Sequence, residues 1–153
     1  MPANGRRKTI LTGLVSTIRT ATWADFFFDY SVTEMVTLGK DALETRLEGT
    51  KPLSVRVWDA GESHQIDSAG GKSRLDVIIE VAIKDSAQNL VERMADVMAD
   101  LSLIIGRNPG LGGVSTTCRL AAVDPPFYQF GKAYATGRLH VRADYEYDPG
   151  VDR

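Results

Sequence analysis

The sequence predicts an α+β fold, with a mostly antiparallel sheet of about five strands and one long and one short amphipathic helix packed on it. Apolar residues recur at three- and four-residue steps through residues 85–107, which is typical of a helix with one buried face. Apolar and polar residues alternate through residues 138–147, which favours a half-buried strand. With 153 residues, 43% of them hydrophobic, the chain has the size of one domain, so we expect residues 1–153 to form a single domain.

The amino-terminal part of the chain contains the short helix and two of the strands. Residues 8–20 place their apolar side chains at helical spacing, which predicts the short helix. Aromatic and β-branched residues alternate through residues 25–37 and favour a strand. Residues 40–49 are compatible with a short helix or with irregular structure. Residues 53–58 alternate again and predict a second strand.

A polar stretch separates this second strand from the next. Residues 75–83 alternate with one fully apolar face and predict a strand. Residues 60–73 are rich in glycine, serine and charged residues, and they are too many for an ordinary hairpin turn. We therefore expect a loop that is mobile or functional. Its candidate partner-contacting residues are His64, Gln65 and Lys72.

The long helix has sequence signals at both ends and an acidic face. Asp85 and Gln88 have the spacing of a capping box, and glycine, asparagine and proline after Arg107 end the helix. Glu92, Asp96 and Asp100 recur every four residues and share a face. This face meets solvent or a basic partner.

Two further strands are predicted near the carboxyl terminus, at residues 114–123 and 138–147. The connection between them, residues 124–137, carries four aromatic residues among prolines and glycines: Phe127, Tyr128, Phe130 and Tyr134. Exposed aromatic side chains in a loop indicate an interface. The alternative is that the loop folds back and covers an open face of the sheet.

Residue types needed for catalysis or metal binding do not occur in recognisable patterns. His64, His140 and Cys118 lack metal-ligand spacing, and Lys72 follows glycine without the rest of a phosphate-binding loop. We therefore expect no catalytic residue, cofactor or metal. The net charge of −2 provides no broad basic field for nucleic acid, and no apolar run is long enough to span a membrane. A single cysteine excludes an internal disulfide and favours synthesis in a reducing cytoplasm.

Most of the chain resembles the tail terminator proteins of long-tailed bacteriophages. The resemblance rests on a long amphipathic helix followed by the sequence NPGLGGV at 108–114, Pro125 and Pro126, the final DYEYD at 144–148, and PLSVRVWD at 52–59. It implies a non-catalytic virion protein, assembled in the host cytoplasm, that forms a homo-hexameric ring on the head-proximal end of the tail tube. Such a ring stops tube polymerisation and offers a surface to head completion or connector proteins.

The resemblance also implies that genomic DNA passes through the lumen of the ring without specific binding. Under this hypothesis Glu92, Asp96 and Asp100 line the lumen and repel the DNA backbone. Two alternatives stay open. One is another neck, head completion or minor tail protein, and the other is a small-molecule-binding or enzymatic α+β domain, for which a deep pocket with converging polar groups would be the sign.

Overall fold

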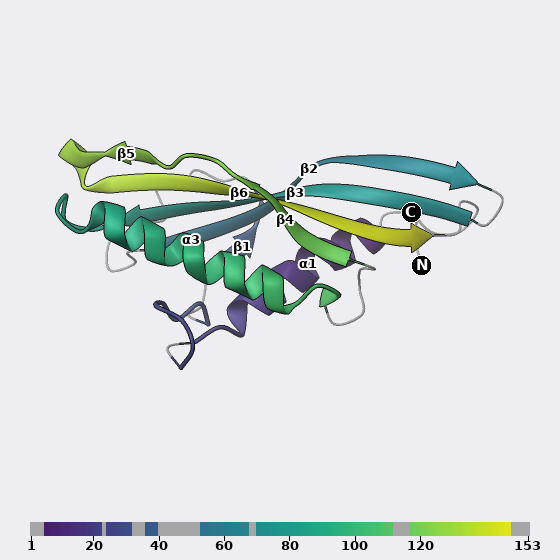
Figure 1. The fold of residues 1–153 in the computed structure, drawn as a ribbon, viewed down its shortest axis with the longest axis horizontal. Coiled ribbons are helices and arrows are strands. Elements are labelled where there is room, and N and C mark those ends of the chain that lie inside the picture. Colours follow the sequence, from purple (N-terminus) through teal and green to yellow (C-terminus); the bar gives the residue numbers. More distant parts are fainter. Residues whose placement is uncertain are drawn as a thin grey trace.

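A computed structural model describes residues 5–22, 24–31, 36–39, 53–67, 70–111 and 117–147. One six-stranded sheet carries two helices against one of its faces (Figure 1), which confirms the predicted α+β fold. The strand order is β1-β2-β3-β6-β4, and β5 pairs with β6 as well. The elements are α1 (Gly5–Arg19), β1 (Val36–Leu38), β2 (Leu53–Asp67), β3 (Gly70–Lys84), α3 (Leu90–Arg107), β4 (Thr117–Val123), β5 (Phe127–Gln129), the 3₁₀ helix η2 (Phe130–Lys132) and β6 (Tyr134–Tyr147).

The core lies between the sheet and the two helices. The predicted apolar face of β3 is buried, and so is the predicted apolar face of β6 from Leu139 to Tyr145. Helix α3 buries the residues that its periodicity predicted: Leu90, Met94, Val97, Leu101 and Ile104. Gly137 of β6 lies beneath α3, where a Cβ atom would contact the side chains of Met94 and Met98. A glycine there therefore lets the helix lie close to the sheet.

The prediction of a strand over residues 25–37 is wrong for its first part. Residues 24–31 form turns, and among the described residues of this segment the strand is Val36–Leu38, paired in parallel with β2. The cause is Asp100, which the structure buries to 3% exposure. Its carboxylate accepts hydrogen bonds from the Phe27 amide at 3.0 Å, the Phe28 amide at 3.3 Å and the Tyr30 hydroxyl at 2.9 Å. These bonds hold the aromatic segment against α3 in a turn conformation.

The same contacts correct the predicted acidic face of α3. Glu92 is exposed and Asp96 is half-buried, whereas Asp100 faces the protein interior. Burial raises the pKa of the Asp100 carboxyl, against the opposing effect of the hydrogen bonds it accepts from Phe27, Tyr30 and Phe28. Asp100 is therefore a structural residue and not a candidate for the lining of a lumen.

The predicted loop over residues 60–73 is also wrong. β2 and β3 are both long strands that pair in register as far as Asp67↔Gly70. A bulge between Asp59 and Gly61, with Gly61 at φ +147°, lets β2 continue past the point where its apolar alternation ends. Polar side chains occupy both faces beyond this bulge, so the hydrophobic pattern disappears although the backbone pairing does not.

Two smaller predictions also differ from the structure. Helix α3 begins at Leu90, and Asp85 accepts a hydrogen bond from the Ser86 amide instead of forming a capping box. The segment 124–137 is not one loop, because it contains β5, η2 and the start of β6. The described part of the predicted strand 114–123 begins at Thr117, and residues 40–49 lie outside the described residues.

We expect Asp100→Ala to destabilise the protein by roughly 2–4 kcal/mol, because the substitution leaves two backbone amides and the Tyr30 hydroxyl without their acceptor. Urea denaturation followed by tryptophan fluorescence measures this change. Tyr30→Phe removes one of the three donors and should cost about 1 kcal/mol. Asp96→Ala is the matched control on the same helix, and an equal loss in this control would contradict the role of Asp100.

Candidate functional site

The residues that the sequence singled out lie on three separate surfaces. Phe127, Tyr128, Phe130 and Tyr134 lie at one end of the sheet, and His64 and Lys72 lie near its opposite end, where β2 and β3 meet in their hairpin (Figure 1). The third surface is the solvent side of α3. The structure therefore does not bring these candidate residues together into one site. The side chain of Gln65 is outside the described part of the chain.

The aromatic residues form a short arm on the end of the sheet, which we define as residues 127–134. β5 pairs with the first residues of β6, and η2 closes the hairpin. Ala133 takes a left-handed conformation at φ 52°, and its amide donates to the Phe130 carbonyl at 3.1 Å. The rings of Tyr128 and Phe130 stack with centroids 5.4 Å apart and planes 11° apart. This stacking holds the arm in a defined shape.

The four aromatic residues divide between the two roles left open by the sequence. Tyr128 packs against the main core, and Tyr134 packs against buried Ala82. Phe127 is 60% exposed and Phe130 is 50% exposed. The two tyrosines therefore cover the sheet, while the two phenylalanines remain accessible for contact with another surface.

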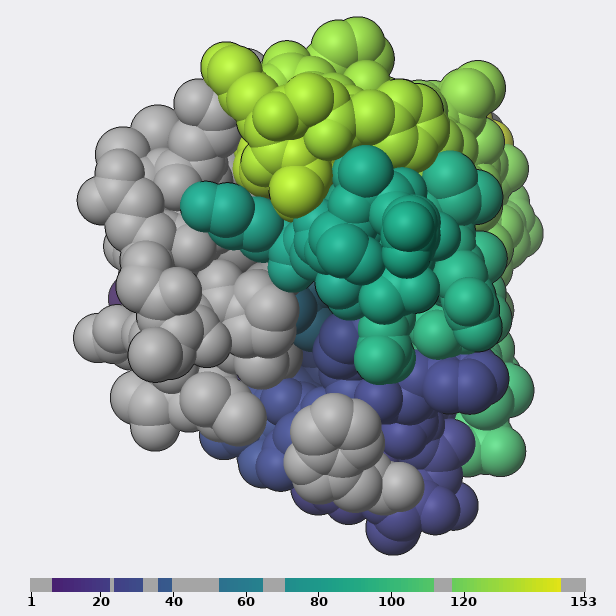
Figure 2. Space-filling model, turned by 90° about the vertical axis from the view of Figure 1, so that its left-hand side faces the viewer, coloured from purple at the N-terminus to yellow at the C-terminus, as the bar shows by residue number. Residues whose placement is uncertain are grey.

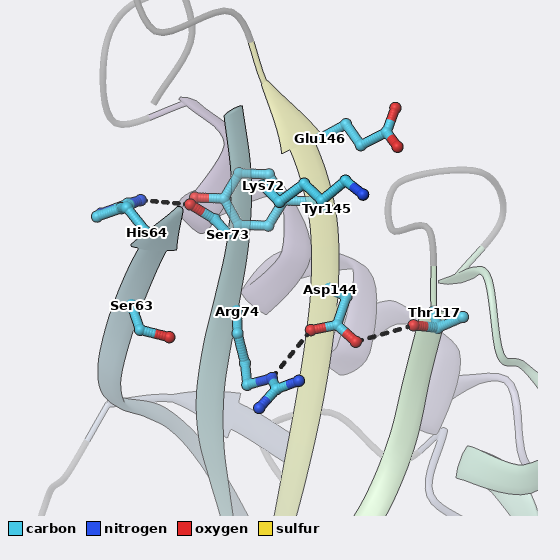
Figure 3. Close-up of a pocket in the computed structure, with 9 residues that line it drawn as sticks. All are labelled: Ser63, His64, Lys72, Ser73, Arg74, Thr117, Asp144, Tyr145 and Glu146. Carbon is cyan, nitrogen blue, oxygen red and sulfur yellow. Dashed lines mark hydrogen bonds and ion pairs between the residues drawn. The ribbon is translucent and has the colours of Figure 1, made fainter. Parts of the chain in front are cut away.

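A groove of about 690 Å³ lies at the opposite end of the sheet (Figure 3). It is lined by polar and charged side chains from β2, β3, β4 and β6: Ser63, His64, Lys72, Ser73, Arg74, Thr117, Asp144, Tyr145 and Glu146. Arg74 donates to the Asp144 carboxylate at 3.2 Å, and the Thr117 hydroxyl donates to the same group at 3.2 Å. These contacts connect three strands across the groove.

Beside this groove, Glu62 is the centre of a partly buried polar network. Its carboxylate accepts hydrogen bonds from Arg7 Nε at 3.0 Å and from the Tyr145 hydroxyl, and His64 Nε2 lies 3.7 Å away. The hydrogen bond to Glu62 raises the pKa of Arg7. The network joins the first turns of α1 to β2 and β6.

The alternation in the sequence does not predict this network, because the bulge in β2 changes which of its side chains face the helices. Before the bulge, the odd-numbered residues of β2 face the helices, and after it Glu62 and His64 do. A glycine inside a strand pattern is the signal that indicates such a bulge. Gly61 is therefore the residue of the sequence that indicates the bulge.

Ser73, His64 and Glu62 have the residue types of a hydrolytic triad, and Ser73 Oγ is hydrogen-bonded to His64 Nδ1. Their environment does not fit this chemistry. Ser73 is only 3% exposed, and Glu62 is already engaged by Arg7 and Tyr145. In a triad the carboxylate orients the histidine through a hydrogen bond, whereas Glu62 lies 3.7 Å from His64 Nε2, beyond hydrogen-bond distance. The arrangement is that of a structural network.

Charged side chains on β3 and β6 pair across the sheet face that points away from the helices. Glu80 pairs with Arg138 at 3.2 Å, and Asp76 pairs with Arg142 at 3.3 Å. Arg74 and Asp144 continue the row with reversed polarity. Each of these charges on β3 and β6 has its counter-charge on the neighbouring strand, and Arg119 of β4 lies opposite Arg142.

Within the described ranges, no three His, Cys, Asp or Glu side chains are placed to hold a metal ion together. None of the helices in these ranges has the length and apolar content needed to span a bilayer.

Comparison with known proteins finds similarity in the fold alone. No protein family matches the sequence, and no curated protein is similar to it. The fold is similar to that of a chain in the solved structure of the virion of a native gene transfer agent particle, with a TM-score of 0.54 and 11% sequence identity. The similarity covers 90% of this chain and 95% of that chain, so it extends over nearly the whole of both folds.

We expect Glu62→Ala to destabilise the protein by about 1–3 kcal/mol, because it leaves the buried Tyr145 hydroxyl and the Arg7 guanidinium without their acceptor. Hydrogen exchange should show the loss first in α1, which Arg7 connects to the sheet. Asp59→Ala is the matched control, because Asp59 lies 3.6 Å from the same arginine but is much more exposed. Equal effects of the two substitutions would rule out a special role for Glu62.

Proposed function

We propose that this chain is a structural subunit of a phage-like virion, and specifically a tail terminator. In this role a homo-hexameric ring of the protein caps the head-proximal end of the tail tube. The ring stops tube polymerisation and offers its other side to a head completion or connector protein. Genomic DNA passes through its lumen without specific binding.

The observation that carries the proposal is the fold shared with a chain of a gene transfer agent virion over 90% of this sequence. That chain belongs to a virion particle. The sequence resemblance to tail terminators points to the same class of particle. The two lines of argument agree on a structural protein of a virion, and the terminator role is the more specific part of the proposal.

The surfaces of the subunit are compatible with assembly. Phe127 and Phe130 are exposed on an arm of defined shape, and aromatic side chains are typical anchors of protein interfaces. A ring of identical subunits needs contacts between unlike surfaces of each subunit. The arm, the solvent side of α3 and the polar groove differ in shape and chemistry, as such contacts require.

Two of the three acidic residues proposed to line the lumen remain candidates. Asp100 is excluded by its burial, and Glu92 and Asp96 stay as proposed acidic residues on the outside of α3. His64 and Lys72 stay as proposed partner contacts at the groove.

A different neck, head completion or minor tail protein is the nearest alternative, because the shared fold supports any of these virion roles. Deleting the coding sequence from the genome that carries it, followed by electron microscopy of the particles, separates them. A terminator predicts tails of excessive and variable length that carry no heads. Tails of normal length, with or without attached heads, would contradict the terminator role.

We expect the double substitution Phe127→Ala and Tyr128→Ala to weaken ring formation or docking to neighbours by at least tenfold, because it removes an exposed anchor and one ring of the stacked pair. Light scattering measures the assembly, and circular dichroism during heating measures the fold. Phe27→Ala is the control, since Phe27 is an equally exposed phenylalanine away from the arm. Because Tyr128 also packs against the core, Phe127→Ala alone should keep the fold and still weaken assembly. Loss of the folded monomer in this single variant would contradict the interface role.

A further inference from the structure

We propose that the aromatic arm of one copy of this chain docks on an apolar row along α3 of a second copy. The row consists of Val91, Ala95, Ala99 and Leu103. The inference rests on the proposed function, because it names the contact between neighbouring subunits of the ring. It assigns both halves of that contact to residues whose exposure is known.

The apolar row is accessible along most of the helix. Val91 is 50% exposed, Leu103 is 42% exposed, and both alanines are exposed as well. Residues at four-residue spacing form one ridge of a helix, and this ridge extends over about 18 Å at 1.5 Å per residue. α3 therefore has a second apolar strip besides the one that it buries against the sheet.

The shapes of the two surfaces are complementary. The two alanines form a shallow stretch about 6 Å long between the larger side chains of Val91 and Leu103. On the arm, Phe127 and Phe130 project from a rigid hairpin, and the stacked Tyr128 supports Phe130. Small residues let an aromatic ring approach a helix closely, and burial of such rings dominates the energy of many interfaces.

The charges beside the two surfaces are complementary as well. Glu92 and Asp96 form the ridge next to the apolar row, and Lys132 and Lys84 lie at the end of the sheet beside the arm. Within the described part of the chain, none of these four residues forms an ion pair. The acidic ridge therefore meets a basic arm, which corresponds to the basic partner that the α3 sequence suggested.

The neighbouring strand edge is a less suitable docking surface than the arm. The amide of Cys118 on β4 already donates to the Pro109 carbonyl. A bulge between Leu120 and Ala122 interrupts the strand, and Pro125 and Pro126 follow it without amide donors. Bulges and prolines are the features that prevent edge-to-edge pairing. This side of the subunit therefore offers side chains and not a backbone ladder.

The test is disulfide formation between copies, using Ala95→Cys on the helix and Gly131→Cys on the arm. A Cβ atom at Gly131 meets no other atom within 4 Å, and Ala95 is exposed, so both variants should fold. Cys118 does not interfere, because it is buried and burial raises its pKa to about 11. Mixing the two single variants under mild oxidation should give a cross-linked dimer within minutes.

The matched control replaces Ala95→Cys by Ser16→Cys, which is also an exposed position and lies on α1. We expect at least tenfold less dimer from the control mixture. Equal yields from the two mixtures, or no dimer from either, would overturn the proposed contact.

A charge exchange provides a second, independent measurement. Lys132→Glu should raise the concentration needed for half-assembly about threefold, as for one exposed ion pair. Adding Glu92→Lys should restore it, and failure of this rescue would count against the contact.

The outcomes separate this inference from the proposed function. A hexameric ring that forms without the 95–131 cross-link would overturn the contact and leave the ring intact. A cross-link in a species that never closes into a ring would support the contact and contradict the terminator role.

Discussion

The long antiparallel pairing of β3 with β6, from Gly71↔Tyr147 to Lys84↔Tyr134, organises the whole sheet. This ladder places the other strands, because β2 pairs with β3, β1 pairs with β2, and both β4 and β5 pair with β6. The same register gives the sheet its two ends. One end carries the aromatic arm beside the start of α3, and the other carries the polar groove (Figure 2 shows the arm end, with α3 directly below it). A subunit built on this ladder exposes different chemistry at each end.

The unlike surfaces of one subunit link the fold to the proposed assembly. Each charge in the row on β3 and β6 faces its counter-charge within the subunit. The exposed phenylalanines and two lysines are at the arm, and the exposed apolar row and two carboxylates are on α3. Within the described part of the chain, these lysines and carboxylates form no ion pair. Apolar and charged groups that find no counterpart within one subunit can find it on the next. The proposed ring uses these surfaces and needs no reactive group.

Local periodicity predicted the fold well where one face of an element is buried. The inward residues of α3, β3 and β6 follow directly from the three- to four-residue and two-residue repeats. The predictions failed where a distant contact overrides a local pattern. The aromatic alternation of residues 25–31 indicates a strand, but Asp100, which is about 70 residues away in sequence, holds this segment in turns. Beyond Gly61, β2 has no apolar alternation, and the sequence therefore predicts a loop. The backbone of β2 nevertheless continues to pair with β3, which in turn pairs with β6. Within the candidate site, the sequence identified the aromatic residues by their unusual number in one segment. The Glu62 network depends on a bulge, and the effect of this bulge on side-chain direction appears only in three dimensions.

We propose that this subunit assembles into a closed ring through unlike surfaces. Multi-angle light scattering of the purified chain over a wide range of concentrations, followed by electron microscopy of the largest species, would detect such a ring. The proposal predicts a hexamer, about six times the subunit mass of 16.7 kDa, seen as a six-fold ring with an open lumen. A protein that stays monomeric at every concentration, or that forms only two-fold dimers, would contradict it.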